Sequence, residues 1–305
     1  MAIDTVSQVL DIVGPPIYVY HEIVHNRHVV EEFTRQGVVF VDQISQVPPQ
    51  ATLVFSAHGV SPQIRNAAKA RGCHMIDATC PLVTKVHTKA IRYAKKGYKL
   101  LLIGHAGHDE VVGTVGEAPD AFTIVESAQD VEKLTFTPED SLAYLTQTTL
   151  SIDDANIIIK AIKQKYPQVK QPPTEDICYA TTNRQHAVRD ACKNVDAVLV
   201  VGSVNSSNSV RLTEIAKNDN TPAYLLDDKS ELQASWFQGV NRLLITAGAS
   251  APEKLVQEII DHLVQHHQGK IIPSQTIDEK MHFNLPVGLR ILKRDGSPPQ
   301  NISYT

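Results

Sequence analysis

Short runs of valine, isoleucine and leucine alternate along the chain with longer stretches in which apolar residues recur at helical spacing. Such runs are typical of parallel strands buried on both faces, and their alternation with helices indicates βαβ units. The predicted strands are residues 17–20, 38–41, 53–56, 100–103, 122–125, 142–145, 197–201, 223–226 and 242–246. The clearest predicted helices are residues 61–71, 84–96, 151–166, 183–193, 206–218 and 251–268. The fold class is therefore α/β.

The strand endings recur in two interleaved series. FSAHGVS, TQTTLS and TAGASAP form one series, HEIVHN, GHAGHDE and GSVNSSNS form the other, and members of each lie roughly 90 to 100 residues apart. This spacing predicts three pseudo-repeated α/β domains, with mainly parallel sheets, around a central cavity. With junctions at turn-rich, proline-containing stretches, we expect domains at 1–80, 81–175 and 176–270. Residues 271–305 are expected to form a C-terminal tail with one short strand.

Composition narrows the class of protein. The 305 residues carry 29 Lys and Arg against 33 Asp and Glu, for a formal charge of −4. This balance predicts no basic face for nucleic acid, and no apolar run is long enough to span a membrane. The first residues, MAIDTVSQVLDIVG, lack a basic leader and predict an amphipathic helix instead of a signal peptide. We therefore expect a cytoplasmic protein that handles a small molecule.

Polar side chains that donate hydrogen bonds gather where the predicted strands end and helices begin. In open α/β sheets, ligands bind beyond the carboxyl ends of the strands, where helix N-termini attract anions. A single serine at such a place is more often a helix cap, and a single histidine is more often structural, so the recurrence carries the prediction. A phosphate or diphosphate suits the residues there, which are His25, His58, His105, His108, Ser206, Ser207, Asn208 and Ser250.

Two further motifs contain candidates for acid chemistry. Glu110 follows His108 in a glycine-flanked turn, from which a carboxylic acid can donate a proton, although a solvated acidic residue opening a helix is the simpler interpretation. Thr148 and Thr149 end an apolar strand, where a hydroxyl can orient a substrate or a water. Packing at a strand end is the alternative for both threonines.

The four cysteines divide into two pairs. Cys80 precedes a proline that we expect to break regular structure, and Cys178 begins a polar turn before a helix, where the helix dipole favours a thiolate. Both are candidate ligands or nucleophiles, whereas Cys73 and Cys192 are expected to be inert. Since no CxxC spacing occurs, a metal centre must draw its ligands from separate parts of the chain.

Taken in order, HEIVHN, FSAHGVS, DATCPLVTKVH, IGHAGHDEVVGT, TQTTLS, DICYATTNRQ, VVGSVNSSNS and TAGASAP resemble the motifs of the 4-hydroxy-3-methylbut-2-enyl diphosphate reductase family. The resemblance covers nearly the whole chain. It implies a three-lobed α/β oxidoreductase of the non-mevalonate isoprenoid pathway that holds a [4Fe-4S] cluster. It further implies reductive dehydroxylation of an allylic diphosphate to isopentenyl and dimethylallyl diphosphate, with ferredoxin or flavodoxin as electron donor.

The resemblance also implies roles for single residues. Cys80 and Cys178 would be cluster ligands, Glu110 the proton donor, and Thr148 the residue that holds this relay in place. The residues implied in diphosphate binding are His25, His58, His108, Ser206, Ser207, Asn208 and Ser250.

One departure from the family pattern concerns the cluster. Family members begin with a strand and a loop of the type PRGFCAGV, which supplies a third cysteine, whereas this sequence opens with the helix expected after that loop. The third ligand is thus absent from this chain. Either the start codon was placed at an internal methionine, which we favour, or the chain is a truncated, cluster-deficient diphosphate-binding paralogue without activity.

A metal-dependent phosphohydrolase is a further alternative, with His21 and His25 as zinc or iron ligands. An HxxxH pair of this kind needs both imidazoles on one helical face, whereas these two follow a predicted strand and a turn. The pattern therefore disfavours the hydrolase.

Overall fold

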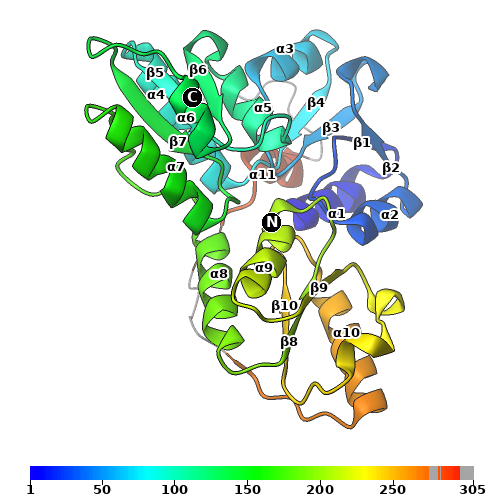
Figure 1. Ribbon diagram of the computed structural model, residues 1–305. Helices are drawn as coiled ribbons and strands as arrows, with labels where there is room; N and C mark the ends of the chain where they lie inside the picture. The colour runs from blue at the N-terminus through cyan, green and yellow to red at the C-terminus, as the bar shows by residue number, and fades with distance from the viewer. Residues whose placement is uncertain (275–280, 282, 296–305) are drawn as a thin grey trace.

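The computed structural model describes residues 1–274, 281 and 283–295. Within them lie three β-sheets, and each sheet with the helices that cover it is here called a lobe (Figure 1). The strand orders are β2-β1-β3-β4, β6-β5-β7 and β10-β8-β9, and all strand pairs in these sheets are parallel. In every lobe the first strand therefore lies between the second and the third. This common order confirms the repeat predicted from the two series of strand endings.

The first lobe contains β1–β4 and is covered by α1, α2, α3 and, from the far end of the described chain, α11. Its elements are α1 (Ala2–Val13), β1 (Ile17–Tyr20), α2 (Arg27–Arg35), β2 (Val38–Val41), β3 (Thr52–Phe55), α3 (Pro62–Ala70) and β4 (His74–Asp77). The strand β4, with sequence HMID, was not predicted, because its two ends are polar and only its two central residues are buried.

The second lobe contains α4 (Pro81–Lys95), β5 (Lys99–Ile103), α5 (Asp109–Gly116), β6 (Phe122–Val125), α6 (Ala128–Lys133), β7 (Leu142–Thr146) and α7 (Ile152–Lys165). The third contains α8 (Tyr179–Cys192), β8 (Ala197–Val201), α9 (Ser207–Asn218), β9 (Ala223–Leu226), β10 (Leu243–Ala247) and α10 (Glu253–His267). All residues of β7 and β8 are buried, as their unbroken apolar runs predict for strands covered on both faces.

The C-terminal part of the described chain corrects one prediction. Instead of a short strand, it forms α11 (Val287–Asp295), which packs against α1 and β4 of the first lobe. Leu289 and Leu292 are fully buried there, in the same core as Val6 and Val9 of α1. The prediction failed because α11 has only two helical turns of apolar residues and is flanked by prolines, which are typical of loops.

The proline after Cys80 corrects a second prediction. Pro81 does not interrupt regular structure but is the first residue of α4, and Cys80 is the residue before the helix. Proline suits this position because its fixed φ is helical and the first turn needs no amide donor. Likewise α8 begins at Tyr179, directly after Cys178, earlier than predicted.

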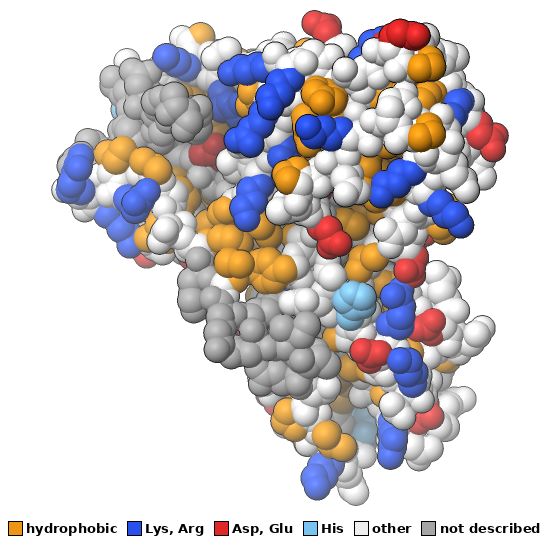
Figure 2. Space-filling view, turned by 90° about the vertical axis from the view of Figure 1, so that its left-hand side faces the viewer, with side chains coloured by type: hydrophobic (Ala, Val, Ile, Leu, Met, Phe, Trp, Pro, Cys, Tyr) orange, Lys and Arg blue, Asp and Glu red, His pale blue; other side chains and the backbone are white. Residues whose placement is uncertain are grey.

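One face of the molecule has mixed charge. On the face in Figure 2, Lys and Arg side chains lie among hydrophobic and acidic side chains over both the broad and the narrow part of the molecule. In the described part of the chain, every helix is too short or too polar to cross a lipid bilayer.

Candidate active site

The shared strand order explains where the polar turns meet. In each lobe the second strand lies on one side of the first strand, and the third strand lies on its other side. The strand order therefore reverses direction at the first strand, which makes its carboxyl end a topological switch point. Ligands of open α/β sheets bind at such points, beyond the carboxyl ends of the strands. The described contacts join the turns that follow β1, β3, β5, β7, β8 and β10, across all three lobes.

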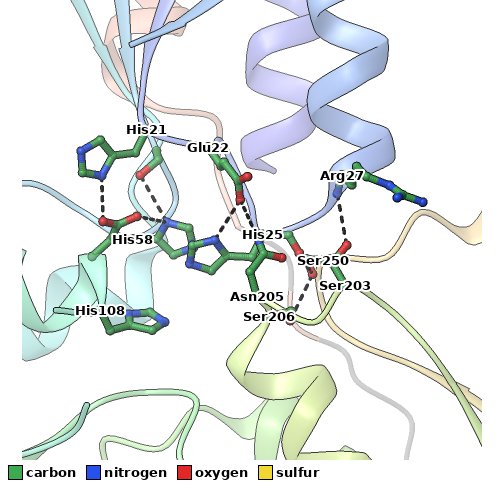
Figure 3. Close-up of polar contacts among 12 residues, drawn as sticks. His21, Glu22, His25, Arg27, His58, His108, Ser203, Asn205, Ser206 and Ser250 are labelled. Carbon is green, nitrogen blue, oxygen red and sulfur yellow. Dashed lines mark hydrogen bonds and ion pairs between the residues drawn. The ribbon is translucent and has the colours of Figure 1, made fainter. Parts of the chain in front are cut away.

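Three predicted histidines form one cluster (Figure 3). The rings of His25, after β1, and His58, after β3, stack with centroids 4.1 Å apart. His108, from the turn after β5, lies edge-on to both, at 5.4 Å from His25 and 5.9 Å from His58. The structure thus brings together side chains that are 83 positions apart in the sequence.

Burial keeps two of these rings uncharged. Burial, together with the neighbouring His25, lowers the pKa of His58 to about 3 and that of His108 to about 4. A neutral imidazole still offers one ring N–H to an anion, so these rings suit an anion site.

The turns of the third lobe close over this cluster. The Ser250 hydroxyl donates to the backbone carbonyl of His25 at 3.0 Å and lies 3.5 Å from Ser206 Oγ. Ser206 caps α9, and its Oγ accepts from the backbone N–H of Ser209. The amide of Asn205 donates to Glu22 at 2.8 Å, and Glu22 lies 3.1 Å from His25 Nδ1 (Figure 3). Serines and histidines from different lobes therefore form one surface.

Close packing of glycines places the turns. A Cβ on Gly202, after β8, would lie 2.2 Å from Ser209 Oγ and 2.8 Å from its Cβ, so α9 can start here only beside a glycine. A Cβ on Gly116 of α5 would lie 2.3 Å from the Cβ of Ser61 in the first lobe. The first contact packs α9 closely against the turn after β8, and the second packs the C-terminal end of α5 against the first lobe.

Asn208 is an unpartnered polar group at the start of α9. Its side chain is only 4% exposed, and neither amide atom has a hydrogen-bond partner within the described protein. A buried amide without partners costs free energy, so such a group indicates a missing ligand or water. Its neighbour Ser207 donates to the carbonyl of Thr149 at 3.3 Å, linking α9 to the turn after β7.

Glu110 is held by Thr148. Glu110 lies in the first turn of α5, and the residue is 2% exposed. It accepts from the backbone N–H of Thr148 at 2.6 Å and from the Thr148 hydroxyl at 2.8 Å. The structure therefore excludes the solvated acidic residue that was the alternative for Glu110, and it gives Thr148 a defined partner.

Burial also sets the charge of Glu110. Its pKa is raised to about 7, mainly by desolvation. The negative charge of Asp176 also raises the pKa, whereas the two hydrogen bonds from Thr148 lower it. The pKa of Asp176 is itself raised by burial, which its ion pair with Lys89 opposes. A carboxylic acid with a pKa near neutrality can both hold and release a proton at physiological pH.

The two candidate ligand cysteines adjoin these turns. The backbone N–H of Cys80 donates to Ala57, next to His58, at 2.9 Å, and that of Cys178 donates to Thr148 at 3.0 Å. Burial raises the pKa of the Cys80 thiol, and Cys178 and Glu110 are close enough to raise it further. Cys73 and Cys192 lie instead in the apolar cores of the first and third lobes.

A second group of possible metal ligands lies nearby. His25, His58 and Asp109 each place a donor atom within 4.8 Å of the others. One oxygen of Asp109 is already bonded to His21, and His25 Nδ1 faces Glu22, so we interpret the group as a hydrogen-bond and ion-pair network. His21 directly follows β1 and His25 precedes α2, so they do not share a helical face, as expected.

Some residues of the site differ from the predicted set. His105 does not join the histidine cluster through any described ring contact: its Nε2 lies 2.9 Å from Arg211. Asp109, Asp176 and Lys89 were not singled out, because isolated charged residues before a helix or in a turn have no distinctive spacing. The position of Asp109 between His108 and Glu110 was the one available signal.

Comparison with known proteins assigns this arrangement to a family. The family model described as LytB protein matches residues 1–264. The chain belongs to the LytB protein family. A relative of this family from Rhodopirellula baltica, 4-hydroxy-3-methylbut-2-enyl diphosphate reductase, is 53% identical over 95% of this chain and 91% of its own. The enzyme of the same name from Zymomonas mobilis is 48% identical over 99% of this chain and 88% of its own.

Solved structures of LytB relatives agree with the fold. The E-1-hydroxy-2-methyl-but-2-enyl-4-diphosphate reductase from Plasmodium falciparum is 40% identical and superimposes with a TM-score of 0.93, covering 96% of this chain and 93% of its own. A second structure, of (E)-4-hydroxy-3-methyl-but-2-enyl diphosphate reductase, is 29% identical with a TM-score of 0.64, covering 87% and 93%. The three-sheet α/β architecture is therefore that of the family.

Proposed function

We propose that this LytB protein is an oxidoreductase that removes the hydroxyl group of 4-hydroxy-3-methylbut-2-enyl diphosphate. The C–O bond of the allylic alcohol breaks and water leaves, with two electrons and two protons consumed, one proton ending in the water and one in a new C–H bond. The products are isopentenyl and dimethylallyl diphosphate, which differ in the carbon that receives the proton. The observation that carries the proposal is Glu110, a buried acid with a pKa of about 7, beside a cluster of anion-binding side chains.

The diphosphate is bound by the turns around the histidine cluster. His25, His58 and His108 supply ring N–H groups, and the start of α9 supplies backbone N–H groups and the positive end of its dipole. The unpartnered amide of Asn208 gains the hydrogen bonds it lacks. The hydroxyls that complete this set are those of Ser206, Ser207 and Ser250.

The thiols of Cys80 and Cys178, close to Glu110, are suitable ligands for an iron–sulfur cluster. Cys80 and Cys178 are free, adjoin the turns after β3 and β7, and interact electrostatically with each other. We assign them as two of the thiolate ligands of a [4Fe-4S] cluster. When bound, such a cluster supplies single electrons and a Lewis-acidic iron. The four cysteines of this sequence offer no third ligand at the site, because Cys73 and Cys192 lie in apolar cores.

The acid and its partner carry the proton chemistry. With a pKa near 7, Glu110 holds a proton in part of the molecules at neutral pH, donates it to the leaving oxygen and recovers a proton from solvent. Thr148 fixes both carboxyl oxygens, so the acid points in one direction throughout the reaction. The remaining parts of the proposal are a ferredoxin or flavodoxin as electron donor and a cytoplasmic location, where the four free thiols stay reduced.

The test is anaerobic purification followed by iron and sulfide analysis and by turnover with reduced methyl viologen. A brown protein that converts the substrate to the two five-carbon diphosphates supports the proposal. A colourless protein that binds inorganic pyrophosphate without turnover would assign it instead to the cluster-deficient binders. A zinc protein that releases phosphate would make it a hydrolase.

A further inference from the structure

Asp109 lies between two histidines of another lobe. It is the first residue of α5, and its Oδ1 accepts from His21 Nδ1 at 2.7 Å. Its Oδ2 is 3.8 Å from Nδ1 of His58 (Figure 3 draws both interactions). Neither Asp109 nor His21 has a role in the reaction proposed above. Asp109 nevertheless contacts His58 of the diphosphate site and is itself bonded to His21.

The His21–Asp109 contact favours the charged form of both side chains. The hydrogen bond from Asp109 raises the pKa of His21, which burial opposes. Burial alone would raise the pKa of Asp109, but the bond from His21 and the charges of the surrounding histidines lower it. The N-terminus of α5 also favours a carboxylate at this position. His21 is held in place by its backbone, which has φ of 57° and donates to Val41, and by stacking on Tyr20.

Several groups face His58 from the surrounding elements. On the Nδ1 side are Ser56 Oγ at 3.4 Å, from the end of β3, and the Asp109 carboxylate from α5. His25 stacks on the ring from the turn after β1, and His108 meets its edge. His21 contributes a more distant positive charge. Nδ1 therefore faces oxygen atoms, of which the carboxylate oxygen can only accept a hydrogen bond.

A neutral imidazole has a single N–H group. When Nδ1 carries it, facing Asp109 and Ser56, Nε2 presents a lone pair and cannot bind a diphosphate oxygen, which also only accepts. When Nε2 donates to a diphosphate oxygen, Nδ1 of a neutral ring can only accept, from Ser56, whereas a ring protonated on both nitrogens is also attracted to the Asp109 carboxylate 3.8 Å away.

We propose that Asp109, fixed by His21, is a positioning residue that couples diphosphate binding to the uptake of one solvent proton by His58. The inference rests on the proposed function, because the ligand is taken to be a diphosphate. The proton is acquired on binding: in the free protein, burial and His25 hold the pKa of His58 at about 3, so the ring is neutral.

The test is isothermal titration of the cluster-loaded protein with inorganic pyrophosphate at pH 8, in two buffers that differ in ionisation enthalpy. The dependence of the measured heat on the buffer gives the number of protons taken up. Proton exchange by pyrophosphate itself and by the rest of the site enters both titrations, so the difference between wild type and Asp109→Asn isolates the coupling. We expect wild type to take up more protons, by as much as about one per site, and its affinity to fall more steeply with rising pH.

Asp153→Asn is the matched control. Asp153 also lies in the first turn of a helix, α7, and is paired with Arg189, but it belongs to none of the contacts around His58. We expect this variant to take up as many protons as wild type. Thermal unfolding verifies that the Asn variant is folded, and Asp109→Ser, which keeps a residue favoured at helix starts, replaces it if it is not.

The outcomes separate the two proposals. Equal proton uptake by wild type and a folded Asp109 variant overturns the inference and leaves the proposed function standing. Failure of wild type to bind pyrophosphate contradicts the proposed function itself.

Discussion

Replacement of Glu110 by Gln is expected to make the protein more stable and less active, and the gain in stability should grow with pH. The amide has nearly the shape of the protonated acid, so it can accept from the Thr148 backbone and donate to the Thr148 hydroxyl. It cannot ionise, and it cannot supply a proton. The variant therefore removes the acid while preserving the contacts seen at 2.6 and 2.8 Å.

The magnitude follows from the pKa of the folded protein. Because one pKa unit is worth about 1.4 kcal/mol, moving the pKa from 4.5 to about 7 costs about 3 kcal/mol of folding stability once Glu110 is fully ionised. Between the two pKa values the folded state binds more protons than the unfolded state, so the free energy of unfolding falls as pH rises through this window. The Gln variant avoids this cost, and its advantage over wild type should grow by about 2–3 kcal/mol from pH 5 to pH 8.

The assay is urea unfolding of both proteins at pH 5, 6.5 and 8, followed by circular dichroism, with turnover measured on the same preparations. Turnover should collapse while pyrophosphate affinity changes little, because the Glu110 carboxyl group is bonded to Thr148, and the one described hydrogen bond from Glu110 to a histidine runs from its backbone N–H to His108, which the substitution keeps. A difference in stability that does not change between pH 5 and pH 8 would show that Glu110 is not a buried acid of raised pKa. Retained turnover would remove it from its assigned role.

Three further substitutions test other parts of the site. Thr148→Val removes the hydroxyl donor to Glu110, so the pKa of Glu110 should rise further and the alkaline limb of the pH–rate profile should move to higher pH. Thr148→Ser should restore the wild-type profile. An unchanged profile for Thr148→Val would contradict the role of Thr148 in holding Glu110. Cys178→Ser should abolish stable iron and sulfide binding. The control Cys192→Ser, in the apolar core of the third lobe, should leave the iron content unchanged. Equal iron content in the two variants would refute the ligand assignment. Gly116→Ala places a Cβ 2.3 Å from that of Ser61 and should destabilise the protein at the contact between the first two lobes by about 1–3 kcal/mol, measured by thermal unfolding. Unchanged stability would show that α5 and Ser61 are not closely packed.

The architecture could be predicted from the sequence because it rests on local signals. Unbroken apolar runs mark strands buried on both faces, and their endings repeat in a fixed order that the three sheets share. The failures occur where the local signal is weak and distant contacts decide the structure. The strand β4 has polar ends, and α11 is a short helix whose burial depends entirely on contacts with α1 and β4.

The site was predictable in its composition but not in its geometry. Recurrence of histidine and serine turns indicated an anion site, and these turns do meet. The sequence could not decide whether Glu110 is buried, because burial depends on the turn after β7 closing over it. Nor could it show that His105 turns toward Arg211 or that Asp109 pairs with His21, since both contacts join distant segments.

Isotopic labelling tests the central claim most directly. The substrate carries oxygen-18 in its hydroxyl group, and the reaction is run in heavy water with the cluster-loaded protein and a one-electron reductant. The account predicts that the label leaves as water, that both phosphates stay on the five-carbon chain and that the product gains one deuterium on carbon. Release of phosphate with the label retained in a five-carbon alcohol would contradict it.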